Sequence, residues 1–133
     1  MSRLMGIDYG SARTGIALGD TETRVASPWC VIPSQDELRL LDENSRIVNA
    51  ELVHTLIVGV PRQPRALDQE SDQAKEIRMF IQRLRDRGHV VVEEDETWST
   101  ALAARQTREQ GQRGKRDDLA ATVILQTYLD RER

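Results

Sequence analysis

The stretch RLMGIDYGSARTGIAL, residues 3–18, decides the fold class of this chain. Its first half, residues 3–9, is an apolar run that ends at Gly10, which predicts a β-strand. A second apolar run, residues 14–18, follows after a short connection, and this spacing is typical of a β-hairpin. Residues 24–32 predict a third extended segment. We therefore expect an antiparallel meander of three strands.

The rest of the chain predicts helices that alternate with two further strands. Ser34 and Glu37 have the spacing of a capping box, in which their side chains satisfy backbone N–H groups at a helix start. The clearest amphipathic helix spans residues 69–87 and ends at Gly88. Further elements are predicted as buried strands at residues 55–60 and 89–92, and as helices at about 99–110 and 117–131 around a loop at 111–114.

Strands that are separated by helices are expected to be parallel, with right-handed crossovers. The prediction is thus an α/β fold in a single domain, residues 1–133. Its sheet is mixed and five-stranded, a three-strand antiparallel meander plus two parallel strands, and helices flank it. The core-facing residues predicted for the first two helices are Leu38, Leu41, Val48 and Leu52, followed by Ala74, Ile77, Ile81 and Leu84.

The composition, 38% apolar and 31% charged with a net charge of −3, indicates a globular protein rather than a disordered one. No apolar run approaches the roughly 20 residues that span a bilayer, and the N-terminus does not resemble a signal peptide, so we expect no membrane contact and a cytoplasmic location. A single cysteine, Cys30, offers no disulfide and no metal-binding spacing. We expect it to pack as a small apolar group.

Acidic residues follow several of the predicted strands. Asp8 closes the first strand, Asp95 and Glu96 follow the fifth, and the pair Asp117 and Asp118 opens the last helix. Ligands of open α/β sheets gather at the carboxyl ends of the parallel strands, so these carboxylates are expected at one edge. Each acid also has a purely structural interpretation, as a turn residue, a helix cap or a partner of a helix dipole. Their agreement in position favours a site.

Clustered carboxylates are hard oxygen ligands for Mg²⁺ or Mn²⁺, and the reaction that uses such a cluster is phosphodiester hydrolysis. The basic run that precedes Asp117 could hold a nucleic-acid backbone, or it could be a solvated surface. That run, residues 101–116, contains Arg105, Arg108, Arg113, Lys115 and Arg116 against the single acid Glu109.

Other candidate groups fit catalysis less well. His54 and His89 lie at predicted strand starts, opposite the acids, and we expect both to be structural. Either tryptophan could stack on nucleobases, but core packing is favoured for Trp29, whereas for Trp98 the two interpretations stay open.

Four ordered motifs resemble the YqgF/RuvX family, which is similar to Holliday junction resolvases of the RuvC type. They span almost the whole chain, from about residue 4 to residue 130. They are GIDYG at 6–10 with RTG at 13–15, IVGVP at 57–61, DE at 95–96 with STA at 99–101, and Asp117 with AA at 120–121 and ILQTYL at 124–129.

The resemblance implies a ribonuclease-H-like fold and a metal-dependent nuclease, a hydrolase that acts on ester bonds. It implies Asp8, Glu96 and Asp117 as catalytic metal ligands, with Asp118 and Asp95 in reserve. Its substrate would be precursor 16S ribosomal RNA in ribosome biogenesis, or branched DNA as the alternative. The expected nucleic-acid contacts are Arg13, Arg62, Arg65, Arg108, Arg113, Lys115 and Arg116.

The chain departs from the family pattern at two places. Thr97 and Trp98 stand where relatives carry an arginine and an aliphatic residue, and the segment after Pro61 is rich in arginine and proline. Arg62 or Arg65 could replace the missing arginine at a phosphate or carboxylate. These departures concern substrate contacts more than the metal site.

Two other functions compete with the nuclease interpretation. An actin-like or sugar-kinase ATPase starts with a similar strand and turn, but it needs two related domains and this chain has the length of one. A non-catalytic binding module is disfavoured because all three acids are present. Resolvases of this fold act as dimers, and no apolar helix is spare for that purpose, so we expect a monomer or a weak homodimer.

Overall fold

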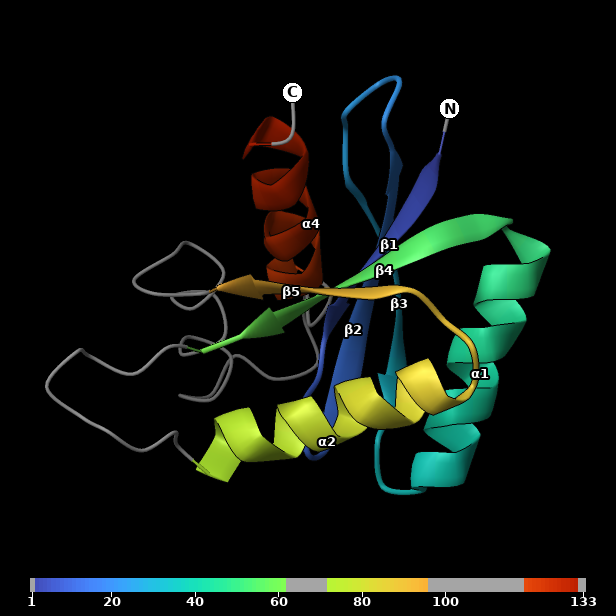
Figure 1. Cartoon of the computed structure of the whole chain (residues 1–133), viewed down its shortest axis with the longest axis vertical. Helices are drawn as coiled ribbons and strands as arrows, with labels where there is room; N and C mark the ends of the chain where they lie inside the picture. The colour runs from blue at the N-terminus through green and yellow to red at the C-terminus, as the bar shows by residue number, and fades with distance from the viewer. Residues whose placement is uncertain (1, 62–71, 96–118, 132–133) are drawn as a thin grey trace, which may run out of the picture.

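A computed structural model describes residues 2–61, 72–95 and 119–131. Within them, five strands form one sheet in the order β3-β2-β1-β4-β5, shown in Figure 1. β1, β2 and β3 are antiparallel, and β4 and β5 run parallel to β1, which confirms the mixed sheet. The elements are β1 (Arg3–Asp8), β2 (Arg13–Asp20), β3 (Ser27–Pro33), α1 (Glu37–Ala50), β4 (Val53–Val60), α2 (Asp72–Asp86), β5 (Val91–Asp95) and α4 (Leu119–Arg131).

The helices cover both faces of the sheet. Alternate residues of β1 supply two apolar clusters, because neighbouring side chains of a strand point to opposite faces. Met5 and Ile7 pack with α1 and α2, whereas Leu4 packs with α4. α4 lies on the opposite side of the sheet from α1 and α2 (Figure 1). No helix in the described part of the chain is long and apolar enough to cross a membrane. The predicted helix at 99–110 lies outside the described residues.

α4 lies unusually close to β1 at Gly6. A Cβ atom at this position would be 2.7 Å from the carbonyl oxygen of Ala121 and 2.8 Å from Cβ of Leu125. Further along α4, Leu129 approaches Gly19, which pairs with the start of β1 at Leu4. α4 therefore runs opposite to β1 and begins near its carboxyl end, the end that carries Asp8.

The predicted cap and apolar face of α1 were partly wrong. Asp36, not Ser34, caps the helix by accepting a hydrogen bond from the N–H of Arg39 at 3.2 Å. The hydroxyl of Ser34 instead bonds that of Thr14 at 2.7 Å, because Ser34 lies beside β2 before the helix begins.

The buried face of α1 consists of Leu40, Leu41, Asn44 and Ile47, while Leu38 and Leu52 are largely exposed. A buried asparagine interrupts the apolar spacing, so the face is rotated from the one predicted. The Nδ2 group of Asn44 donates to the carbonyl of Leu40 at 2.8 Å. The face predicted for α2 is confirmed, with Phe80 in addition to the four expected residues.

Candidate active site at the carboxyl edge of the sheet

Asp8 is the last residue of β1, and its side chain is completely buried. It shares a sheet face with Leu4 and Gly6, the face on which α4 packs. In the register of the sheet, Asp8 pairs with Gly15 of β2, and the pairing of Ile7 with Val58 brings Gly59 of β4 to the same level. The two residues that flank Asp8 in the sheet are therefore both glycines, which carry no side chain.

The turn after Asp8 requires a glycine. A Cβ atom at Gly10 would collide with the carbonyl oxygen of Arg13, so the chain can reverse this tightly only without a side chain there. The reversal places Arg13, the first residue of β2, at the same edge as Asp8. Among the expected nucleic-acid contacts, Arg13 is the one within the described ranges.

Asp95 ends β5 at the same edge, level with Val60 of β4. Strand alternation gives Asp95 the face of Val91 and Glu93, which α2 covers, whereas Asp8 is on the face of α4. Glu96, Asp117 and Asp118 lie outside the described residues. Within residues 2–61, 72–95 and 119–131, no three His, Cys, Asp or Glu side chains form a cluster that could hold a metal ion.

Glu94 is a second buried carboxylate at the level of Asp8 in the sheet, and it was not identified from the sequence. Glu94 pairs with Gly59, the neighbour of Asp8, and is 2% exposed. Arg131 at the end of α4 donates to both of its carboxylate oxygens, at 2.8 and 2.7 Å. The alternation in VVEED, which gives Glu94 the face of Val92, is the signal that could have found it. This pair attaches the end of α4 to β5.

We expect Arg131→Ala to lower the free energy of unfolding by about 2 kcal/mol, because it leaves a buried carboxylate without its bidentate partner. The figure is below that of a fully buried pair since the Arg131 side chain is 54% exposed. Urea unfolding measures the change. The double variant Arg131→Ala with Glu94→Gln should recover part of the loss, and no recovery would contradict this explanation.

The remaining sequence candidates lie elsewhere. His54 is the second residue of β4, with Nδ1 2.6 Å from the Thr55 hydroxyl, and Nε2 of His89 is 3.0 Å from the Ser45 hydroxyl. Burial, and then the nearby charge of Arg87, lower the pKa of His89 below its usual value. Both histidines are at the amino edge, opposite Asp8, although His89 precedes β5 instead of starting it.

Cys30 packs against the apolar core as expected, but Trp29 does not. Its side chain is 49% exposed, because it lies on the edge strand β3 at a break in the pairing with β2. The preference for core packing was therefore wrong, and stacking on a nucleobase stays open for Trp29.

The mixed sheet with its flanking helices has the ribonuclease-H-like fold that is found in solved RuvC-like resolvases. Thermus thermophilus RuvC bound to a Holliday junction is similar to this chain, with a TM-score of 0.60 and 12% identity over 98% of this chain and 95% of that one. The fowlpox virus Holliday junction resolvase is similar with a TM-score of 0.55 and 13% identity, over 97% and 98% of the two chains.

The chain matches the RuvX family, described as Holliday junction resolvase, over residues 2–131, and it belongs to that family. A relative from Bacteroides fragilis is 35% identical over 100% of this chain and 99% of its own length. One from Chloroflexus aggregans is 32% identical over 98% and 94%. Both are named "Putative pre-16S rRNA nuclease". The chain is accordingly a nuclease, a hydrolase that acts on ester bonds.

Proposed function

We propose that this nuclease processes the 5′ end of pre-16S ribosomal RNA in the cytoplasm, using Mg²⁺ or Mn²⁺. The observation that carries the proposal is the buried carboxylate of Asp8 at the carboxyl end of β1, on the sheet face where α4 begins. The names of the relatives support the choice of RNA.

The proposed metal ligands are Asp8, Glu96 and Asp117. Two features of the described structure support this set: Asp95, which immediately precedes Glu96, ends β5 at the edge of Asp8, and α4 starts two residues after Asp117 with its first turn toward that edge. Carboxylate oxygens suit a hard divalent cation, and a cation offsets the cost of burying the Asp8 charge. Asp118 and Asp95 remain reserve ligands.

The protein's own residues would position the substrate. A bound divalent ion supplies Lewis-acid chemistry, activating water and stabilising the leaving oxygen. Asp8 is rigidly placed, because its strand is paired on both sides and the turn at Gly10 allows no side chain. Basic side chains, Arg13 at this edge among them, would hold the phosphate backbone against the repulsion of the carboxylates.

The experiment compares three substrates with Mn²⁺ or Mg²⁺: a pre-16S RNA 5′ leader, an unstructured single-stranded RNA and a four-way DNA junction. We expect site-specific cleavage of the leader by the native protein and none after addition of EDTA. Cleavage that persists in EDTA would contradict the metal requirement, and an intact leader beside a cut junction would contradict the RNA assignment.

A branched-DNA endonuclease is the alternative, and the similarity of the fold to RuvC on its junction favours it. A four-way junction needs two symmetric cuts and therefore two copies of the chain. We propose a monomer or weak homodimer on RNA. Sedimentation with and without a junction tests this, and a stable dimer that forms on the junction would support the alternative.

The basic segment before Asp117 should bind phosphates. We expect neutralising Arg113, Lys115 and Arg116 together to weaken RNA binding and to reduce the slope of log K against log salt by about 2, since each contact to a single strand contributes about 0.7. Binding titrations between low and moderate salt, on the Asp8→Asn background, measure this slope. The matched control exchanges lysine and arginine at the three positions and keeps the slope. An unchanged slope in the neutral variant would show that the segment is only solvated.

A further inference from the structure

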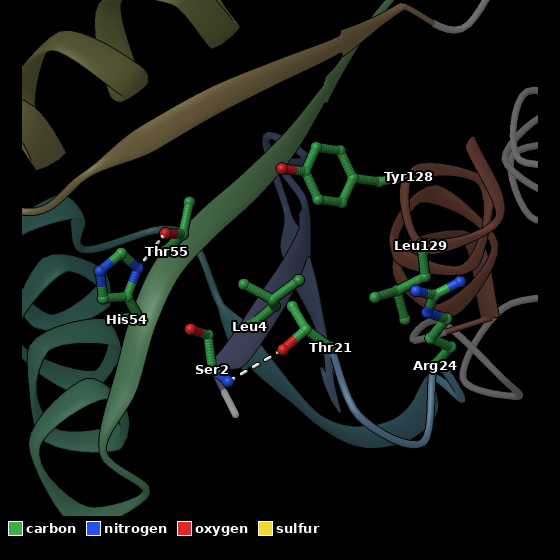
Figure 2. A pocket seen from close by; sticks show the side chains of 8 residues that line it. All are labelled: Ser2, Leu4, Thr21, Arg24, His54, Thr55, Tyr128 and Leu129. Atoms are coloured by element: carbon green, nitrogen blue, oxygen red, sulfur yellow. Dashed lines mark hydrogen bonds between the residues drawn. The ribbon is translucent and has the colours of Figure 1, made fainter. Parts of the chain in front are cut away.

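We propose that a pocket at the amino edge of the sheet binds a nucleoside monophosphate, either free or as the 5′-terminal nucleotide of a strand. The pocket has a volume of about 340 Å³ and lies between the start of β4, the start of β1 and the end of α4 (Figure 2). Residues from four parts of the chain line it: Ser2, Leu4, Thr21, Arg24, His54, Thr55, Tyr128 and Leu129.

This pocket is separate from the site at Asp8. Leu4 in its floor stands four residues before Asp8 on β1, which corresponds to about 13 Å along an extended strand. A ligand bound here is therefore not the phosphodiester that Asp8 would meet. The proposal goes beyond the proposed function, and its test does not depend on cleavage.

Arg24 is the unusual residue of the pocket, because its backbone has a φ of 58°. This left-handed conformation costs a non-glycine residue on the order of 1 kcal/mol. The surroundings impose it. The N–H of Arg24 donates to the Asp20 carbonyl at 3.0 Å, and the Gln126 side chain of α4 bonds the carbonyl of Arg24 and the N–H of Ala26, both at 2.9 Å.

The Asp20 side chain reinforces the same turn. Its Oδ1 accepts hydrogen bonds from the N–H groups of Glu22 and Thr23, at 2.9 and 2.7 Å. A glycine at position 24 would adopt this backbone without strain. The arginine therefore adds strain to a turn that is otherwise well stabilised, and what it contributes in exchange is a guanidinium group beside Leu129 at the pocket.

The lining matches a nucleotide in three respects. The planar guanidinium of Arg24 suits the oxygens of a phosphate, and none of the eight lining residues is acidic although the chain is acidic overall. Leu4, Leu129 and the ring of Tyr128 offer apolar surface for a base. The hydroxyl groups that could bond phosphate or ribose oxygens belong to Ser2, Thr21, Thr55 and Tyr128.

The local contacts hold these groups in place. The N–H of Ser2 donates to the Thr21 hydroxyl at 3.0 Å, which ties the start of β1 to the turn that carries Arg24 (Figure 2). The Arg131 guanidinium, which is paired with Glu94, lies 5.8 Å from the centre of the Tyr128 ring and packs beside that wall of the pocket. The pocket is thus built partly on β1, β4 and α4 and partly on a turn that these hydrogen bonds hold, and such prior order lowers the entropy cost of binding.

The decisive variant is Arg24→Gly, which removes the guanidinium and also relieves the backbone strain. Calorimetric titrations use 5′-AMP, adenosine and inorganic phosphate, without metal and on the Asp8→Asn background. We expect saturable binding of 5′-AMP, at least tenfold weaker binding of adenosine and of phosphate, and at least a tenfold loss with Arg24→Gly. The melting temperature of Arg24→Gly should equal or exceed that of its parent.

The matched control is Arg39→Ala, which removes an exposed arginine of α1 on the other face of the sheet and should leave the affinity unchanged. Absence of saturable 5′-AMP binding, or equal affinity in the Arg24→Gly variant, would overturn the proposal. An equal loss in Arg39→Ala would do so as well, because it would indicate unspecific attraction.

A second arm separates the two sources of the ligand. It compares a short RNA with a 5′-phosphate and the same RNA with a 5′-hydroxyl. Tighter binding of the phosphorylated strand than of free 5′-AMP, lost in Arg24→Gly, assigns the pocket to strand ends. Equal binding of the two RNAs beside saturable 5′-AMP binding assigns it to the free nucleotide. Both results keep the proposal even if the protein cuts none of the substrates tested.

Discussion

Replacing Asp8 with asparagine is expected to lower the rate of metal-dependent cleavage by about 10³-fold or more. This exceeds the roughly 10- to 100-fold loss that is typical when a group that only orients a metal ligand is replaced. Asparagine has the shape of aspartate but no charge, so it offers the cation a much weaker ligand. Single-turnover cleavage of the leader RNA at several Mn²⁺ concentrations measures the loss.

The same substitution should not destabilise the fold. Asp8 is completely buried, and a neutral amide is less costly to bury than a carboxylate, so thermal unfolding should occur at or above the native temperature. Asp42→Asn is the control, because it changes an equivalent group that is 70% exposed on α1 and should leave the rate unchanged. Native cleavage by a folded Asp8→Asn protein would refute the assignment of this carboxylate.

Substitution of Gly6 should have the second largest effect. The Cβ atom of Gly6→Ala would meet Ala121 and Leu125 at less than 3 Å, and overpacking of this kind costs about 1–3 kcal/mol. Gly6→Val should cost more, because its two methyl groups enlarge the collision. Denaturant unfolding of both variants measures the loss.

Gly6 variants should also lose activity under conditions in which they stay folded. α4 must move away from β1 to admit a side chain at position 6. Because α4 begins two residues after Asp117, this movement should also draw that proposed ligand away from Asp8. Gly88→Ala is the control: its backbone φ of 90° also disfavours a side chain, but nothing lies within 4 Å of the added atom. It should lose stability without losing activity. Normal cleavage by folded Gly6→Ala would contradict the role of this close packing.

Local sequence patterns determined most of the secondary structure. The apolar runs around Asp8 and before Pro61, and the stripe from Ala74 to Leu84, give nearly the observed elements, because strand and helix periodicities follow from backbone geometry alone. The position of Asp8 at a strand end was predictable for the same reason. Boundaries and caps were less predictable: Ser34 and Asp36 are equally good caps, and the contact with Thr14 chose between them.

Only the tertiary structure decided which side chains share a face and a level of the sheet. Glu94 and Arg131 lie far apart in sequence, and the parallel register together with the packing of α4 brings them into contact. The exposure of Trp29 depends on β3 being the edge strand, and the strain at Arg24 depends on hydrogen bonds from Gln126. The sequence by itself thus determined the order of the elements and Asp8 as an acid at a strand end. Long-range packing decided what surrounds that acid, because contacts between distant segments leave no periodic signal in the chain.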